Sequence, residues 1–261
     1  MLESISRVRK KVGQLSLRAA AGVALGITAL ALGAVACGSG ESSGLQVTFS
    51  ERTATPAPGG EVRPSPLPLP VVRGLLMPIE GACLPASDSL MPNASRDYRE
   101  GIHEGIDFYG LDNCVDIGRG TKVRAAKVGR VVRADHDYQD LTAEALADLE
   151  ERVGNGETKS PEVLDAFRGR QVWLDHGGGV VTRYAHLSAV ADGIQVGMVV
   201  EAGTVIGYVG DSGTPESVSA PGAEDHVHFE VRVGRGYLGQ GLPPAEVRTL
   251  YEEAFAPEEA P

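Results

Sequence analysis

Short runs in which apolar and polar residues alternate mark the middle and the end of the chain as β-structure. Such runs lie at residues 121–126, 129–135, 171–175, 180–186, 199–210 and 225–233. Alternation with a period of two places every second side chain on the same face of a strand. Three consecutive glycines at 177–179 separate two of these runs and predict a hairpin. The pattern therefore predicts an antiparallel, mainly β domain.

Three other segments carry helix signals instead. Thr142 is a suitable N-cap for a helix that runs to Val153, with a hydrophobic staple across its start and a glycine beyond its end. A second helix is expected to begin at Pro161, because proline suits the first helical position, and to end near Arg168. A C-terminal helix is expected over residues 244–255.

The first two helices fall in one segment, residues 137–168, that interrupts the series of strands. This segment holds nine acidic and three basic residues, which favours a position on a solvated rim of the domain. We expect it to be a small helical insertion. It is a candidate lid, docking surface or inert decoration, and the sequence ranks none of these first.

The N-terminus has the pattern of a bacterial export signal. Basic residues precede an apolar run at residues 19–36, and small residues lead directly into Cys37. We interpret residues 1–36 as a signal peptide and Cys37 as the lipidated residue of a lipoprotein. Secretion without a lipid is one alternative. An uncut membrane anchor is another, since about 18 apolar residues just span a bilayer. All three place the remaining chain outside the cytoplasmic membrane, and the lipoprotein faces the cell wall.

Residues 37–70 show no hydrophobic period and are rich in proline, which favours extended and semi-rigid conformations. We interpret them as a lipid-anchored linker. The globular domain is expected over residues 71–255, and residues 256–261 form a short tail.

Charge excludes one class of partner. The chain carries a net charge of −11, and residues 1–36 contain five basic residues and one acidic residue. Without that segment the net charge would be −15, so the domain would repel nucleic acid and anionic lipid. No nucleic-acid partner is expected.

The chain has three cysteines. If Cys37 is lipidated, Cys83 and Cys114 are the pair that remains, and an oxidising exterior would permit a disulfide between them. Two buried thiols are the alternative.

Histidine placement suggests a metal site. His226 and His228 share one face of a strand because they are two residues apart. His103 precedes Asp107 by four residues, but the surrounding glycines disfavour a helix, so a loop and a starting strand are expected to deliver this pair. Two imidazoles and one carboxylate form a three-ligand set that suits catalytic zinc, because it leaves a position for water. His186, at the end of another strand, is a candidate fourth participant.

His103 is followed by Glu104, as in the HExxH helix of many zinc proteases, but that motif requires a second histidine where Asp107 stands. Without a helix, Glu104 should point away from the metal side. It is therefore rejected as a general base and interpreted as incidental.

Taken together, His103-x-x-x-Asp107, Tyr184-Ala-His186-Leu-Ser and His226-Val-His228-Phe-Glu-Val resemble the motifs of the lysostaphin/LytM-type zinc metallopeptidases, which cut peptide bonds in peptidoglycan. The resemblance covers roughly residues 71–235.

The resemblance implies both a fold and a set of residue roles. It implies a barrel-sandwich hybrid fold, in which two glycine-punctuated hairpins at residues 123–132 and 197–213 resemble the duplicated strand unit. One zinc ion per domain would be bound by His103, Asp107 and His228. His186 and His226 would be the catalytic histidines. The implied substrate is a stem or cross-bridge peptide of peptidoglycan.

Other residues have less specific interpretations. Tyr184 is a candidate substrate contact, with core packing as the alternative. His176 is expected to shape the glycine hairpin, and His136 is expected at the surface. The insertion and the loop at residues 211–225 are candidates to line the substrate groove. The sequence therefore does not identify which peptide bond is cut.

Two other classes of function remain as alternatives. One is a non-catalytic LytM module that binds cell wall or regulates another wall hydrolase, and the other is a β-domain that binds zinc for stability alone. A regulatory protein partner stays an open question. The full set of ligands and the two additional histidines favour the enzyme.

Overall fold

The computed structural model describes residues 72–258, which belong to the second of the two units into which the chain divides, Glu61–Pro261. The predicted signal peptide at residues 1–36 lies outside the described residues. So do Cys37 and the proline-rich linker at 37–70. Within the described part, no helix has both the length and the apolar character needed to span a bilayer.

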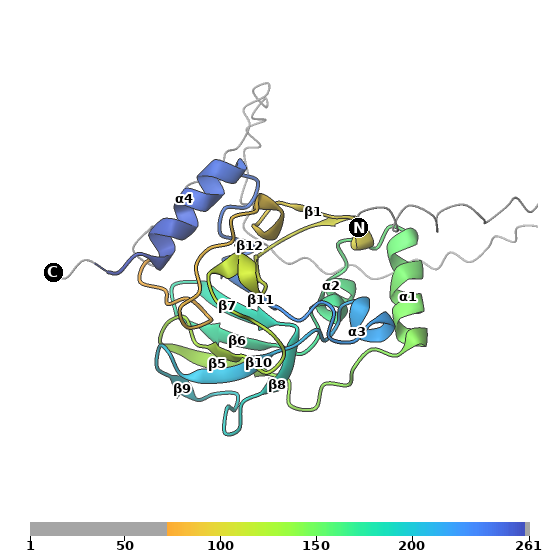
Figure 1. Ribbon diagram of the computed structural model, residues 1–261, viewed down its shortest axis with the longest axis horizontal. Helices are drawn as coiled ribbons and strands as arrows, with labels where there is room; N and C mark the ends of the chain where they lie inside the picture. Colours follow the sequence, from red (N-terminus) through yellow and green to blue (C-terminus); the bar gives the residue numbers. More distant parts are fainter. Residues whose placement is uncertain (1–71, 259–261) are drawn as a thin grey trace, which may run out of the picture. The chain divides into compact units, whose positions relative to one another are not determined.

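Strands dominate the described residues (Figure 1). In chain order they are β1 (Ser95–Arg96), β2 (Gly101–Ile102), β3 (Ile106–Phe108), β4 (Lys122–Arg124), β5 (Gly129–Ala134), β6 (Val172–Asp175), β7 (Val180–Ala185), β8 (Leu187–Val190), β9 (Val199–Val200), β10 (Val205–Val209), β11 (Val227–Val233) and β12 (Gly236–Tyr237). The helices are α1 (Ala143–Gly154), α2 (Pro161–Arg168), α3 (Glu216–Ser219) and α4 (Pro244–Phe255), with 3-10 turns η2 (Asp88–Leu90), η3 (Asp97–Arg99) and η4 (Leu111–Asn113). The predicted fold class, mainly β and antiparallel with a helical insertion and a C-terminal helix, is confirmed.

The larger sheet has the strand order β12-β11-β7-β6-β5-β9, and β3 also pairs with β11. Its pairings are all antiparallel. The predicted glycine hairpin joins β6 to β7, and its three glycines all have positive φ values, which other residues adopt only at a cost. Strand β11 lies between β7 on one edge and β3 on the other. It therefore holds the segment of Asp107 beside the segment that ends at His186.

The smaller sheet has the order β4-β10-β8. Its pairing shows that the two glycine hairpins predicted at β4–β5 and β9–β10 do not form. Strand β4 pairs with β10, whereas β5 pairs with β9, so each predicted hairpin instead crosses from one sheet to the other. Ala125, between β4 and β5, is fully buried. Its N–H donates to the carbonyl of Thr204 and its carbonyl accepts from the N–H of Gly203. The connection between β4 and β5 thus pairs with the connection between β9 and β10, and neither forms a hairpin of its own.

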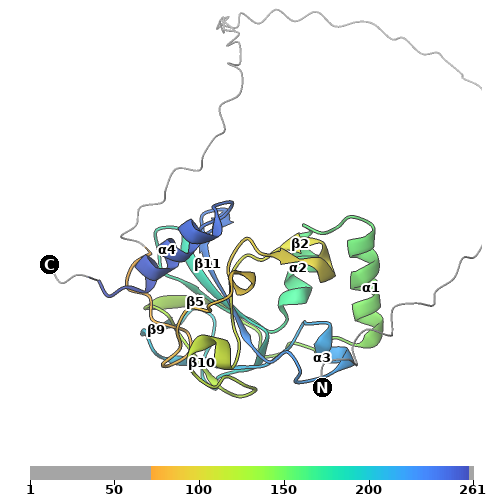
Figure 2. The same ribbon diagram turned by 45° about the horizontal axis from the view of Figure 1, so that its top comes forward.

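The predicted helices of the insertion are confirmed. Thr142 caps α1, since its side chain accepts a hydrogen bond from the backbone N–H of Ala145. The two helices pack against each other through a small apolar cluster of their own, Leu149, Val153, Val163 and Phe167. Figure 2 shows α1 and α2 beside each other on one flank of the strands, with α4 on the other flank. The insertion therefore carries its own core and presents α2 to the rest of the domain.

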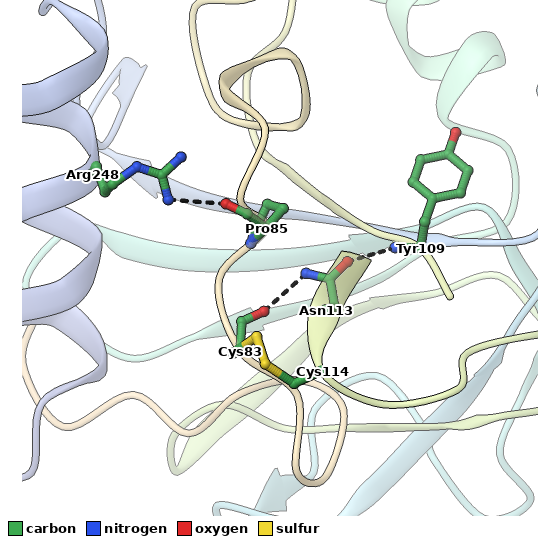
Figure 3. Close-up of a disulfide and its surroundings, with 6 residues drawn as sticks. All are labelled: Cys83, Pro85, Tyr109, Asn113, Cys114 and Arg248. Carbon is green, nitrogen blue, oxygen red and sulfur yellow. Dashed lines mark hydrogen bonds between the residues drawn. A yellow bond between two sulfur atoms is a disulfide. The ribbon is translucent and has the colours of Figure 1, made fainter. Parts of the chain in front are cut away.

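A disulfide joins Cys83 to Cys114 (Figure 3). Asn113 reinforces it, because its side-chain N–H donates to the carbonyl of Cys83 at 2.9 Å and its side-chain oxygen accepts from the backbone N–H of Tyr109 at 2.9 Å. Arg248 of α4 holds the same segment through the carbonyl of Pro85 at 2.9 Å. The bridge thus fixes the chain immediately after β3.

Replacing both cysteines of the bridge by serine is expected to lower the free energy of unfolding by about 2–4 kcal/mol. The disulfide closes a loop across a sequence separation of 31 residues, and its loss returns chain entropy to the unfolded state. Urea unfolding of the variant and of the wild-type chain under oxidising conditions measures the difference. Equal unfolding midpoints would show that the bridge contributes nothing to stability.

Candidate metal centre and active site

Three buried side chains converge on one point. His103 lies in the loop between β2 and β3, Asp107 lies in β3, and His228 lies in β11. Asp107 Oδ1 is 2.9 Å from His103 Nε2 and 2.8 Å from His228 Nδ1, and the two nitrogens are 3.0 Å apart. The predicted loop-and-strand origin of the first two residues is confirmed, and the three predicted ligands lie together.

Strand pairing explains the convergence. Asp107 and His228 are direct partners in the antiparallel register of β3 with β11, which puts their side chains next to each other on one face. The loop carrying His103 approaches β11 closely at Gly105. A Cβ at this position would collide with the carbonyl oxygen of Phe229 and lie 3.0 Å from His228 Cε1. Glycine at 105 is thus a condition for the loop to reach the site.

Hydrogen bonds on the far side of each imidazole set its tautomer. His103 Nδ1–H donates to the carbonyl of Met91 at 2.9 Å, and His228 Nε2–H donates to Glu230 Oε1 at 3.1 Å. When both rings are neutral, the opposite nitrogen of each ring carries a lone pair that faces the carboxylate of Asp107, which is also an acceptor. Three acceptors so placed repel one another unless a cation lies between them, and two nitrogens with one carboxylate oxygen are a ligand set that suits zinc.

The electrostatics of the cluster agree with this requirement. Burial is the largest influence on the pKa of His103 and lowers it to about 4. Burial opposes ionisation of Asp107, but His103 and His228 outweigh it and hold the pKa of this carboxyl well below its usual range. Burial also disfavours the charged form of His228, yet Asp107 and Glu230 raise its pKa, because both carboxylates accept hydrogen bonds from the protonated ring. The site is therefore built around an ionised Asp107 that attracts positive charge.

Arg96 is a site residue that the sequence did not reveal. Its Nη2 is 2.6 Å from Asp107 Oδ2, while its Nη1 donates to the carbonyl of Ser89 at 2.9 Å. Because Arg96 engages Oδ2, Asp107 keeps Oδ1 for a metal and is limited to one ligating oxygen. No motif or spacing distinguishes Arg96 from the other basic residues upstream of β3.

The two predicted catalytic histidines lie beside the three candidate metal ligands. The ring centroids of His186 and His226 are 4.5 Å apart, and His226 Nε2 is 3.7 Å from Asp107 Oδ1. His186 occupies the junction of β7 and β8 with a φ of 59°. This left-handed conformation is uncommon for a residue with a side chain, and such conformations cluster at functional sites.

The loop at residues 211–225 orients both of these histidines. His186 Nδ1–H donates to the carbonyl of Ser212 at 2.8 Å, and His226 Nδ1–H donates to the carbonyl of Glu224 at 2.6 Å. Each Nε2 is left with its lone pair. Burial, the largest influence, lowers the pKa of both histidines, so both rings are neutral at pH 7 and can accept a proton.

The predicted substrate contact of Tyr184 is wrong. This residue is fully buried, and its hydroxyl accepts a hydrogen bond from the N–H of Ala126 at 2.7 Å. Alternation along the strand would place Tyr184 on the same face as His186, but the left-handed conformation of His186 breaks that alternation. The tyrosine beside the candidate catalytic histidines is instead Tyr109, which stacks on His226 with centroids 4.3 Å apart and donates its hydroxyl to Glu224 at 2.7 Å. Tyr109 lies two residues after Asp107, so alternation along the strand places both side chains on one face. This spacing is the sequence signal that could have identified Tyr109.

Glu104 does not face the metal cluster, in agreement with its rejection as a general base, but it is not incidental. Its carboxylate accepts hydrogen bonds from Arg168 at 2.7 Å and from Arg232 at 2.6 Å. Glu104 is therefore part of an ion-pair network behind the site.

The other two histidines lie away from the site. His176 Nδ1–H donates to the carbonyl of Val128, and Nε2 forms a hydrogen bond with the hydroxyl of Thr182, each at 2.8 Å, so His176 holds the glycine hairpin as predicted. His136 is exposed, also as predicted.

One cavity of about 340 Å³ opens over the site. Its lining residues are Ser89, Leu90, Arg96, Tyr98, Arg99, His103, Asp107, Tyr109, Leu164, Phe167, Arg168, His186, Thr214, Pro215, Glu216, Glu224, His226 and His228. Both segments considered as candidate groove linings contribute to it, the insertion through α2 and the loop at residues 211–225 through its two ends. Tyr98 contacts Phe167 edge to face with centroids 5.5 Å apart, which joins the β1–β2 segment to the insertion.

Comparison with solved structures finds similar chains at low identity. A putative peptidase M23 from Pseudomonas aeruginosa has 20% identity and a TM-score of 0.38, over 70% of this chain and 52% of that chain. A zinc-containing peptidase from Vibrio cholerae has 18% identity and a TM-score of 0.41, over 66% and 41%. The catalytic domain of lysostaphin from Staphylococcus simulans has 22% identity and a TM-score of 0.34, over 57% and 81%. The chain thus spans about half or less of the first two proteins.

No curated protein matches the chain. A family match does exist, over residues 151–240, with peptidase family M23. The matched segment contains His186, His226 and His228, and it begins after His103 and Asp107. Residues 151–240, with three of the five predicted site residues, are thus similar to peptidase family M23.

Proposed function

We propose that the chain is a zinc-dependent endopeptidase that hydrolyses peptide bonds in the stem or cross-bridge peptides of peptidoglycan. The observation that carries this proposal is the convergence in one cavity of a three-acceptor centre and two neutral histidines outside it. The family M23 match supports the reaction class, and the lysostaphin/LytM-type motifs support the substrate class.

Zinc at this centre would supply a water of lowered pKa and a Lewis acid for the scissile carbonyl. His103, Asp107 and His228 would hold the ion. Either His186 or His226 would accept the proton of the attacking water at Nε2, because the Nδ1 position of each ring is committed to a backbone carbonyl. The protonated ring would then stabilise the developing oxyanion and return the proton to the leaving amine.

We also propose that the protein acts outside the cytoplasmic membrane, anchored by a lipid on Cys37 and facing the cell wall. The basic and apolar N-terminal sequence supports this location. The disulfide between Cys83 and Cys114 is consistent with it, because such bridges persist in oxidising compartments.

A direct test uses the full-length chain loaded with zinc. We expect purified peptidoglycan to release peptide fragments, detected by mass spectrometry, and we expect His186→Ala to lower the rate by about 10²–10⁴-fold. The zinc content of the variant should stay at that of the wild type, since His186 is not a ligand.

His136→Ala is the matched control, because it removes an exposed histidine remote from the cavity. A zinc-loaded wild-type chain that releases no fragments would contradict the peptidase proposal and favour a non-catalytic cell-wall module. Undiminished cleavage by the His186 variant would contradict the assigned role.

Zinc removal should destabilise the protein, because chelation leaves three acceptors in contact without a metal cation. Binding of a ligand at 100 times its Kd stabilises a folded chain by about 2.7 kcal/mol, which corresponds to about 5–10 °C in Tm for a domain of this size. Differential scanning calorimetry with and without a chelator measures the shift. A His228→Ala variant should show no such shift, and an equal shift in both proteins would argue against this centre.

The anchor has its own test. Cys37→Ser should move the protein from the membrane fraction to the soluble extracytoplasmic fraction, because the thiol that would carry the lipid is gone. Fractionation followed by immunoblotting measures this change, with Cys83→Ser as the control for loss of a cysteine elsewhere. Membrane retention of the Cys37 variant would point to an uncut N-terminal helix.

A further inference from the structure

The last residue of the insertion reaches the interior of the site. Arg168 ends α2 and lies on the wall of the cavity, and 11% of its side chain is exposed. Its side chain spans two carboxylates, with Nε 2.6 Å from Glu230 Oε1 and Nη2 2.7 Å from Glu104 Oε2. The guanidinium therefore acts as a fork between β11 and the loop that carries His103.

Glu230 links this fork to the metal centre. It is fully buried, and its Oε1 accepts from both Arg168 and Nε2–H of His228. Arg183 and Arg232 engage the other oxygen, Oε2, at 3.5 and 3.2 Å. Arg168 is thus the arginine that holds the same oxygen as His228, so it determines where that oxygen lies.

The backbone of Arg168 reaches the second half of the site. Its carbonyl accepts the N–H of His186 at 2.9 Å. His186 has the left-handed conformation, so its backbone needs a fixed partner. One residue therefore touches a partner of the ligand His228 through its side chain and the catalytic candidate His186 through its main chain.

We propose that Arg168 is a positioning residue that makes the helical insertion part of the metal centre, by fixing Glu230 against His228 and by supporting His186. The metal part of this inference stands on the geometry of the centre, and its catalytic consequence rests on the proposed peptidase function. The insertion is accordingly neither an inert decoration nor a detachable lid, because α2 ends inside the ion-pair network.

The expected effect is on metal affinity. Residues that orient metal ligands typically change affinity by 10–100-fold when they are replaced. Arg168→Gln keeps much of the side-chain length and removes the charged fork, so the full-length chain should bind zinc about 10-fold more weakly. Arg168→Lys keeps the charge without the fork and should recover part of this loss.

A double-mutant cycle tests whether Arg168 changes zinc affinity through Glu230. Zinc affinity is measured by competition with a chromogenic chelator for wild type, Arg168→Gln, Glu230→Gln and the double variant. If Arg168 acts through Glu230, the double variant should bind zinc no more weakly than Glu230→Gln alone, since residues in one network are not additive. Arg152→Gln is the matched control, because Arg152 lies on α1 of the same insertion and pairs with Glu157 at the surface.

Three results would overturn the proposal. The first is wild-type zinc affinity in Arg168→Gln, including the case in which the metal-free variant only has a lower Tm, as a purely structural arginine would give. The second is an additive cycle. The third is a wild-type chain that binds no zinc. If zinc affinities separate as expected but no peptidoglycan fragments appear, the positioning role stands and the peptidase function fails.

Discussion

The register between β3 and β11 is the constraint on which the site depends. It sets Asp107 directly opposite His228, and a slip of one residue would send one of the two side chains to the other face of the sheet. Strand β11 also places Glu230 two residues beyond His228, and His226 lies one residue before the strand begins. One short segment thus supplies a candidate ligand, the residue that orients it and a candidate proton acceptor.

The local features of the chain were predictable from sequence, whereas its long-range pairings were not. The helix starts after Thr142 and at Pro161 depend on signals within a few residues, and the structure confirms them. The pairing of β4 with β10 joins segments about 80 residues apart and corrects the predicted hairpins. Nothing within either segment indicates that its partner is distant, because both strands carry the same alternating pattern.

The candidate site divides in the same way. The three ligands and the two other histidines came from residue types and spacing in motifs, and the structure brings all five together. Tyr184 was assigned wrongly because the alternation was carried through His186, where the backbone turns left-handed. Arg96 and Arg168 were missed because each acts through an ion pair with a residue that only the fold brings near it.

The conformation of His186 sets a limit on how the protein can be stabilised. A left-handed backbone costs roughly 1–2 kcal/mol for most residues, and glycine avoids this cost. Replacement by glycine would relieve the backbone while removing the imidazole from the cavity. Screening for thermal stability alone would therefore favour glycine at this position, and the selected chains would lack one of the two histidines beside the candidate metal centre.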